Sequence, residues 1–293
     1  FLGDEQFYLL ILPIFVWWID VGLGLRIGIS LLLSAGINGA IKLCFGMPRP
    51  FWVEPGVKAL SEGTSFGFPS GHSQNALMVW GRLAAWMKGR WVVFGLGLLI
   101  FMISVSRMYL GVHFPTDVLG GWLIGGVLLW ALVRFDRPVR EWLGRQSLGG
   151  QIATVALVSV LILTIGSIAY LGTLNRPLPP SWTEMAASKS PEPIDPQTPA
   201  DFITAAGTLL GMGIGGALLL DWGQFRTNVG WPKRIGRYIL GVIGLMGLYL
   251  GLSAIFPREP VLAAAIFRYL RYALLGLWVT YLAPRLFTLV RLS

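Results

Sequence analysis

Residues 106–117 read SRMYLGVHFPTD and place Arg107, His113 and Asp117 within twelve positions of a mostly apolar chain. Titratable side chains at the edge of a bilayer are costly, so such a cluster indicates a functional site. A guanidinium can grip phosphate oxygens, an imidazole can act as nucleophile or base, and a carboxylate can orient that imidazole. This combination indicates phosphate chemistry; the structural alternative is an ion pair at a helix end.

Two further groups precede this cluster. Lys42 is followed seven residues later by Arg49, and residues 69–72 read Pro-Ser-Gly-His at the start of an apolar segment. Taken singly, the two cations could be interfacial anchors and the Pro-Ser-Gly-His group a helix cap. Taken together with Arg107, they supply three cations, which suit the negative charge that a transferring phosphoryl group spreads over its equatorial oxygens.

The Pro-Ser-Gly-His group adds backbone donors and a second imidazole. Ser70 and Gly71 stand where a helix begins, so free N–H groups and the helix dipole favour an anion there. Gly71 also lets the backbone approach closely. His72 has no acidic neighbour in the sequence, and we predict that it protonates the leaving oxygen and later activates water.

His113 and Asp117 are spaced for an imidazole and its orienting carboxylate. They are four residues apart, on one face if the turn is helical, and Pro115 between them favours a helix start. A carboxylate on one ring nitrogen leaves the other free to attack and stabilises the cation that forms. We therefore predict that His113 is the nucleophile and that Asp117 orients it.

These three motifs closely resemble those of the type 2 phosphatidic acid phosphatase superfamily, which also contains the vanadium haloperoxidases. The family pattern is Lys, six residues, Arg-Pro; then Pro-Ser-Gly-His; then Ser-Arg, five residues, His, three residues, Asp, and residues 42–50, 69–72 and 106–117 match it without a gap. The resemblance implies a phosphatase that needs no metal or cofactor and works through a phosphohistidine. It also implies which residues bind phosphate: Lys42, Arg49, Ser70, Gly71 and Arg107.

The composition places these motifs in a membrane protein. Of 293 residues, 55% are hydrophobic and 13% are charged, whereas a soluble domain carries about 25% charged residues. The net charge of +9 does not indicate nucleic-acid binding, because the basic residues fall mainly in short loops between apolar segments. There they are typical of topology signals and contacts with anionic lipid headgroups.

The apolar segments predict the fold. A transmembrane helix needs about 20 apolar residues, which gives an all-α, polytopic bundle of about nine helices at 6–20, 22–45, 72–87, 91–111, 115–135, 150–172, 201–222, 235–256 and 260–289. Residues 1–135 form the predicted phosphatase core with all motifs, and residues 136–293 the C-terminal membrane helices. The polar loop at 173–200 is rich in Pro, Ser and Glu, which predicts an extended or disordered segment.

The distribution of basic residues predicts the orientation. The links after the third, fifth and seventh segments and the C-terminus hold twelve Lys and Arg residues, whereas the other side has four apart from the motifs. The positive-inside rule then places the C-terminus in the cytoplasm and the motifs outside, as in a bacterial inner-membrane protein with a periplasmic site. Arg26 and Arg82 are expected to snorkel to the cytoplasmic face; for Arg268 and Arg271, packing and substrate contact both stay open.

The nine-segment layout also resembles the membrane glucose-6-phosphatases, as do Arg-Pro-Phe-Trp at 49–52 and His-Phe-Pro at 113–115. Asp117 departs from that group and favours the lipid-phosphate pattern. The predicted function is hydrolysis of a phosphomonoester or diphosphate, with a lipid phosphate or prenyl diphosphate as the expected substrate and membrane lipids as surroundings. A soluble sugar phosphate, phosphoryl transfer to an acceptor lipid, and a transporter or scramblase are the alternatives. The oligomeric state is open.

Overall fold

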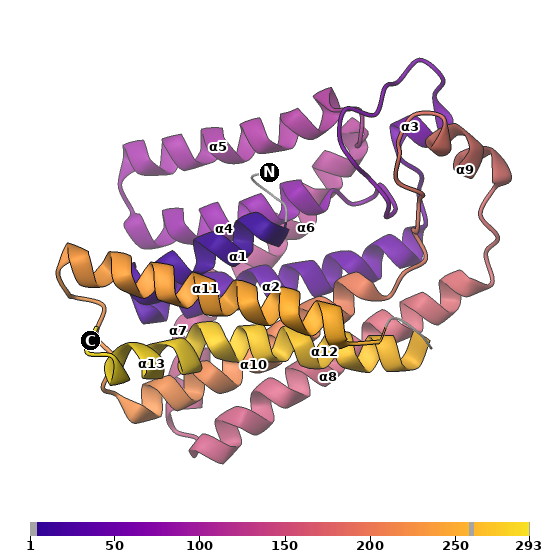
Figure 1. Ribbon diagram of the computed structural model, residues 1–293. Coiled ribbons are helices and arrows are strands. Elements are labelled where there is room, and N and C mark those ends of the chain that lie inside the picture. The colour runs from indigo at the N-terminus through magenta and orange to yellow at the C-terminus, as the bar shows by residue number, and fades with distance from the viewer. Residues whose placement is uncertain (1–4, 258–260, 293) are drawn as a thin grey trace.

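The computed structural model describes residues 5–257 and 261–292, and every regular element in these ranges is helical (Figure 1). The helices are α1 (Glu5–Ile14, continued by a π-helical turn at Phe15–Ile19), α2 (Val21–Phe45), α3 (Pro50–Val53), α4 (Gly71–Met87), α5 (Arg90–Tyr109), α6 (Pro115–Arg134), α7 (Asp136–Gly144), α8 (Leu148–Leu174), α9 (Pro180–Ala187), α10 (Ala200–Trp222), α11 (Trp231–Ile255), α12 (Val261–Leu277, continued by a π-helical turn at Trp278–Leu282) and α13 (Ala283–Leu289). The predicted all-α membrane bundle is confirmed.

The predicted count of nine crossings is not confirmed. Each predicted segment falls on a helix, although residue 260 of the ninth lies outside the described residues. Within the described ranges, seven helices are long and apolar enough to cross a bilayer: Val21–Val53, Arg90–Tyr109, Pro115–Arg134, Leu148–Leu174, Ala200–Trp222, Trp231–Ile255 and Val261–Leu289. The other two are shorter; α4 has 17 residues and so reaches about 26 Å, less than the bilayer core of about 30 Å.

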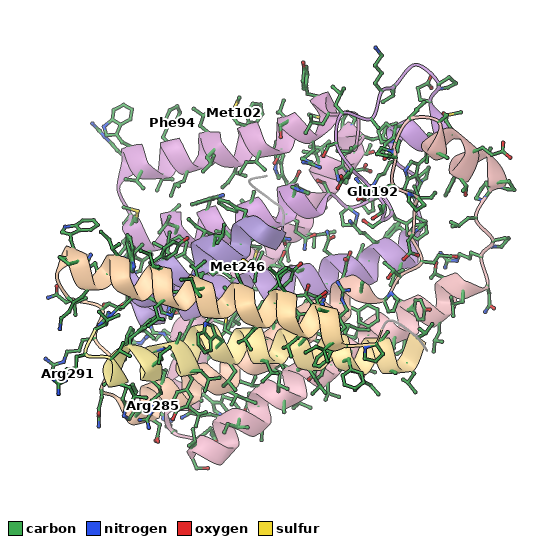
Figure 2. The ribbon with its side chains drawn as sticks, in the orientation of Figure 1. Phe94, Met102, Glu192, Met246, Arg285 and Arg291 are labelled. Carbon is green, nitrogen blue, oxygen red and sulfur yellow. The ribbon has the colours of Figure 1, made fainter. Side chains whose placement is uncertain are left out.

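The helices present apolar side chains outward, as a lipid-facing surface requires. Figure 2 shows Phe94 and Met102 of α5 projecting away from the bundle, and they are 65% and 56% exposed. Exposed apolar residues also follow α6, α8 and α11, among them Leu123, Ile168 and Ile243. The chain is therefore an integral membrane protein.

The segment 173–200 contains a helix packed on α3, which corrects the predicted extended or disordered loop in part. α8 continues to Leu174, and α9 occupies Pro180–Ala187. The Trp182 ring lies 6.1 Å from that of the fully buried Trp52 in α3, and Lys189 Nζ donates to the Glu54 carbonyl at 2.6 Å. Composition did not predict this helix because α9 packs against apolar side chains of α3 and does not form a core of its own.

Helix α2 connects the two parts of the chain. It packs against α4 of the N-terminal part and against α8 and α10 of the C-terminal part. Small residues bring the helices together: a Cβ on Gly39 would lie 3.0 Å from Asp201 Cβ, and one on Gly36 would lie 2.8 Å from Ile162 Cγ2. The N-terminal motifs and the C-terminal helices are therefore neighbours across α2.

Arg26 and Arg82 both reach toward Asp136, at the start of the link after α6 that the sequence predicts to be cytoplasmic. The Arg82 guanidinium is buried and pairs with Asp136, the first residue of α7, and its Nη1 donates to the Leu132 carbonyl at 2.9 Å. Arg26 Nε lies 3.7 Å from the same carboxylate. A carboxylate on the link after α6 thus neutralises two arginines that would otherwise be costly in the membrane.

Candidate active site

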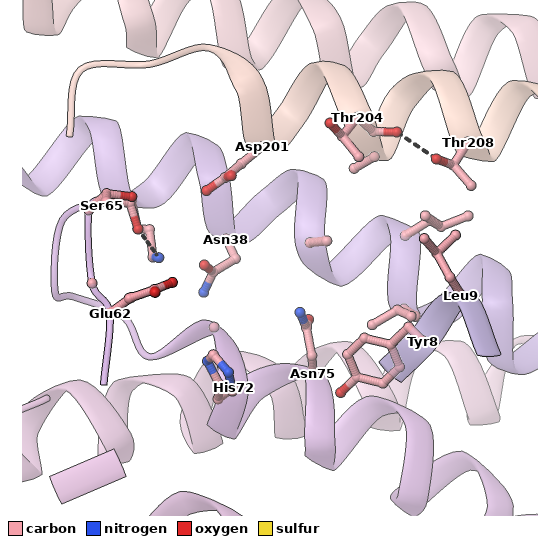
Figure 3. Close-up of a pocket in the computed structure, with 18 of the residues that line it drawn as sticks. Tyr8, Leu9, Asn38, Glu62, Ser65, His72, Asn75, Asp201, Thr204 and Thr208 are labelled. Atoms are coloured by element: carbon pink, nitrogen blue, oxygen red, sulfur yellow. Dashed lines mark hydrogen bonds between the residues drawn. The ribbon is translucent and has the colours of Figure 1, made fainter. Parts of the chain in front are cut away.

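The motif residues meet at one end of the bundle around a cavity of about 940 Å³ (Figure 3). Six of the eight predicted site residues line it: Lys42, Arg49, Gly71, His72, Arg107 and His113. The remaining two, Ser70 and Asp117, are buried behind its wall. Motif residues up to 71 positions apart in the sequence thus contribute to a single cavity.

Lys42 and Arg49 are held by the loop that follows α2. Lys42, in the last turn of α2, donates from Nζ to Ser65 Oγ at 2.8 Å. Arg49 donates from Nε to the Ser65 carbonyl at 2.6 Å and from Nη2 to Ser65 Oγ at 3.1 Å. A Cβ on Gly63 would lie 2.8 Å from Arg49 Cδ, so a glycine lets the loop cover this guanidinium closely.

His113 is fixed on both ring nitrogens. Its Nδ1 lies 3.3 Å from Asp117 Oδ2, and its Nε2 lies 3.4 Å from Arg49 Nη1. Asp117 is the third residue of α6 and also accepts the Phe114 backbone N–H at 2.8 Å, which orients the carboxylate. His113 is 3% exposed and Asp117 2%. With Nδ1–H facing the carboxylate, the Nε2 lone pair faces the cations.

Ser70 serves the structure of the α4 N-terminus. Its Oγ accepts from Ser73 N at 3.4 Å and from Ser73 Oγ at 3.0 Å, and its own N–H donates to the Asp117 carbonyl at 2.9 Å. Ser70 thus caps α4 and ties it to α6. Gly71 and His72, in the first helical turn, face the cavity. Phosphate binding through Ser70 stays a prediction.

Sequence reasoning missed a buried polar network behind the site. Asn38 Nδ2 donates to Gln74 Oε1 at 2.8 Å, and Gln74 Nε2 donates to the Ser34 carbonyl and hydroxyl, each at 3.0 Å. Ser34 Oγ in turn donates to Asn75 Oδ1 at 2.8 Å. The network fixes α4, and with it His72, against α2. A sequence pattern could have indicated this network, because polar residues recur at every fourth position along one face of α2: Ser30, Ser34, Asn38 and Lys42.

The C-terminal helices also contribute to the cavity, which the motifs alone could not indicate. Asp201 and Thr204 of α10 and Arg268 of α12 line it. Arg268 Nε donates to Thr204 Oγ1 at 2.8 Å, so Arg268 both packs and faces the cavity. Arg271 lies over the Tyr249 and Tyr272 rings, at 5.6 and 4.8 Å, which accounts for its place through packing.

The cavity's electrostatics favour an anion beside a neutral histidine. Lys42, Arg49 and Arg107 are 8%, 5% and 6% exposed, and buried cations attract an anion more strongly than exposed ones do because water screens them less. Burial, followed by the positive charge of Arg49 and of Lys42, holds the pKa of His113 well below its ordinary value. A lowered pKa keeps the imidazole unprotonated at neutral pH, the form that a nucleophile needs.

The pKa of His113 can be measured by NMR, because His72 and His113 are the chain's two histidines and replacing His72 leaves a single imidazole to assign. In the His72→Gln variant we expect the imidazole NMR signals of His113 to report a neutral ring at pH 6.5 and to shift only at distinctly lower pH. The denatured variant is the control and should titrate near 6.5. A folded protein whose His113 is half protonated at pH 6.5 or above would contradict the prediction.

Comparisons with known proteins agree with this geometry. Residues 23–141 match the model of the PAP2 superfamily, and residues 203–293 match that of the PAP2 superfamily phosphatase transmembrane extension. The chain is 36% identical over 103 residues to phosphatidylglycerophosphatase B of Bacillus subtilis, covering 31% of this chain and 51% of the relative. It is 30% identical over 127 residues to an undecaprenyl-diphosphatase of Sulfolobus acidocaldarius, covering 41% and 59%.

A longer alignment joins the chain to glucose-6-phosphatase 3 of Rattus norvegicus, with 28% identity over 294 residues, 88% of this chain and 80% of the relative. The chain spans only about half the length of the first two relatives. No solved structure shows significant similarity to it. The chain is therefore a membrane protein that carries a PAP2 superfamily domain, followed by the transmembrane extension of PAP2 superfamily phosphatases.

Proposed function

We propose that this protein is a metal-independent membrane phosphatase that hydrolyses a phosphomonoester or diphosphate, with a lipid phosphate as the main substrate, through a phosphohistidine on His113. The arrangement of His113 between Asp117 and Arg49 carries the proposal. Nδ1 lies 3.3 Å from the carboxylate and Nε2 lies 3.4 Å from the guanidinium. A phosphate bound to Arg49 therefore sits beside the nitrogen that attacks it.

The chemistry proceeds in two displacements. Lys42, Arg49, Arg107 and the backbone N–H groups at the start of α4 hold the phosphoryl oxygens. Nε2 of His113 forms a bond to phosphorus while the bond from phosphorus to the leaving oxygen breaks. The imidazole of His72 gives that oxygen its proton, then takes a proton from the water that hydrolyses the phosphohistidine. Asp117 holds Nδ1–H and stabilises the positive ring throughout.

The names of the relatives support a lipid substrate. Phosphatidylglycerophosphatase B and undecaprenyl-diphosphatase are named for a glycerophospholipid phosphate and a prenyl diphosphate, and a sphingosine-1-phosphate phosphatase 2 of Mus musculus is 33% identical over 136 residues. A sugar phosphate is the second candidate, because the alignment to glucose-6-phosphatase 3 covers most of the chain and Asn38, Asn75 and Asp201 give the cavity polar walls. Transfer of the phosphoryl group to an acceptor other than water uses the same residues.

We place the catalytic unit in residues 1–135, with a cavity that residues 136–293 complete, in a bacterial inner membrane with the site on the periplasmic side. Figure 2 shows Glu192, near the site, at one end of the bundle and Arg285 and Arg291 at the other. The arginine-rich end suits the cytoplasmic side. Phosphate release by the purified protein separates this proposal from a transporter or scramblase.

Chelation tests the absence of a metal requirement. Because three side-chain cations supply the charge that a metal would supply, we expect phosphate release in EDTA to equal that in buffer with Mg²⁺. The substrates are phosphatidate, phosphatidylglycerol phosphate, undecaprenyl diphosphate, a sphingoid phosphate and glucose 6-phosphate. Activity that vanishes in EDTA and returns on addition of Mg²⁺ would contradict the mechanism.

A further inference from the structure

The cavity continues far beyond the phosphate-binding side chains. Along α2 its wall runs from Lys42 through Asn38 and Ala35 to Leu32 and Leu31. These 11 residue steps correspond to about 16 Å at 1.5 Å per residue. A phosphate group occupies only the first part of this length, so the remainder is space for the rest of the substrate.

The polarity of the walls changes along this length. Next to the cations, Asn38, Asn75, Asp201 and Thr204 form a polar middle zone contributed by α2, α4 and α10. Figure 3 shows Tyr8 and Leu9 of α1 at the opposite end from Ser65 and Glu62, with Asn38, Asn75 and Asp201 in between. The cavity therefore passes from the cluster of cations, through a polar zone that also holds Asp201 and Arg268, to apolar surroundings.

We call the apolar end the inner arm; its walls are Leu9, Leu12, Leu31, Leu32, Met212 and Leu275. Its side chains come from α1, α2, α10 and α12. The Met212 side chain lies against Gly28 of α2, where a Cβ would collide with it. Interiors of proteins are close-packed, so an apolar arm of this length indicates an apolar occupant.

We propose that the inner arm holds the single hydrocarbon tail of the substrate, so that this protein acts on single-chain lipid phosphates with a polar group next to the phosphate. The proposal rests on the phosphatase function proposed above. A sugar has no apolar part to fill the arm, and a cavity of about 940 Å³, which must also hold the phosphate and its linker, suits one tail better than two. The polar middle zone receives the linker between tail and phosphate.

The test measures kcat/KM for alkyl monophosphates from butyl to dodecyl, supplied below their micelle concentrations to protein in nanodiscs. Each methylene that enters the arm should raise kcat/KM about fourfold, until the arm is filled and the values level off. Ala35 lies two helical turns from Lys42 and lines the cavity between the polar zone and the arm. In the Ala35→Phe variant the dodecyl-to-butyl ratio of kcat/KM should fall by about tenfold or more.

A matched substitution controls for partitioning of long chains into the nanodisc. Ala153 is on the exposed face of α8, and Ala153→Phe should leave the dodecyl-to-butyl ratio as it is in the unmodified protein. Thr208 of α10 also lines the cavity, and Thr208→Phe is the second test if Ala35→Phe does not fold. Turnover of butyl phosphate shows whether a variant is folded.

The outcomes separate this inference from the proposed function. If the dodecyl-to-butyl ratio of kcat/KM is unchanged in both Ala35→Phe and Thr208→Phe, the tail lies in the bilayer and the inference is overturned. Efficient hydrolysis of glucose 6-phosphate with no gain along the alkyl series also overturns it, although the phosphatase function then stands. Absence of phosphate release from every substrate, the shortest included, overturns the phosphatase function itself and the inference with it.

Discussion

The His113→Ala variant should lose turnover by on the order of 10⁴-fold or more, because it removes the imidazole that lies beside Asp117 and that we propose attacks phosphorus. The cations that hold phosphate keep their contacts: Lys42 and Arg49 are both anchored on Ser65. Vanadate, an anion of similar shape, should therefore bind with an affinity within about threefold of that of the unmodified protein. The measurements are phosphate release and vanadate titration by calorimetry.

A nearby exposed residue provides the control for His113→Ala. Thr116 lies in the first turn of α6 and is exposed, so Thr116→Ala should retain full turnover. Normal turnover in His113→Ala would refute the assignment of the nucleophile. Loss of both turnover and vanadate binding would instead show that His113 supports the pocket rather than the reaction.

The Asp117→Asn variant should lower kcat by about 10³- to 10⁴-fold while leaving vanadate affinity nearly unchanged. The amide can still accept the Phe114 N–H that the carboxylate accepts at 2.8 Å, so the start of α6 is preserved. The amide can no longer stabilise a positively charged His113 ring. It also allows the tautomer that carries its proton on Nε2, which leaves no lone pair there to attack phosphorus. We propose that Asp117 is a positioning residue, for which a fall in kcat at constant anion affinity is the expected signature.

Asp221→Asn is the matched control, because Asp221 is an exposed carboxylate near the end of α10. It should leave both kcat and vanadate affinity unchanged. Equal losses of kcat and of vanadate affinity in Asp117→Asn would assign Asp117 to phosphate binding or to folding. A kcat close to that of the unmodified protein would mean that His113 needs no orienting carboxylate.

Local sequence patterns predicted the helices well because a membrane imposes a simple rule on them. A helix must be apolar over the bilayer, so residues 91–111 and 150–172 fall on α5 and α8 with small differences at the ends. The number of crossings was harder, because α4 is apolar yet only 17 residues long. The helix within 173–200 was missed because α9 packs against Trp52, more than 120 residues earlier in the chain.

The site was predicted as far as its chemistry depends on residue type and short spacing. Three cations, two histidines and a carboxylate in three motifs indicate phosphate chemistry wherever they meet. The structure brings six of the eight to one cavity and shows the remaining two behind it. The polar network of Ser34, Asn38 and Gln74 was missed, although its four-residue repeat on α2 was visible.

The sequence by itself determined that this is a helical membrane protein and predicted a set of phosphate-binding residues, because apolar length and motif spacing are local properties. Only the tertiary structure decided what surrounds the phosphate. Packing of α10 against α2, and of α12 against α10, brings Asp201, Thr204 and Arg268 to the same cavity as Lys42 and His113. Glycines that allow helices to approach closely govern that packing, and no local pattern states which helices will meet.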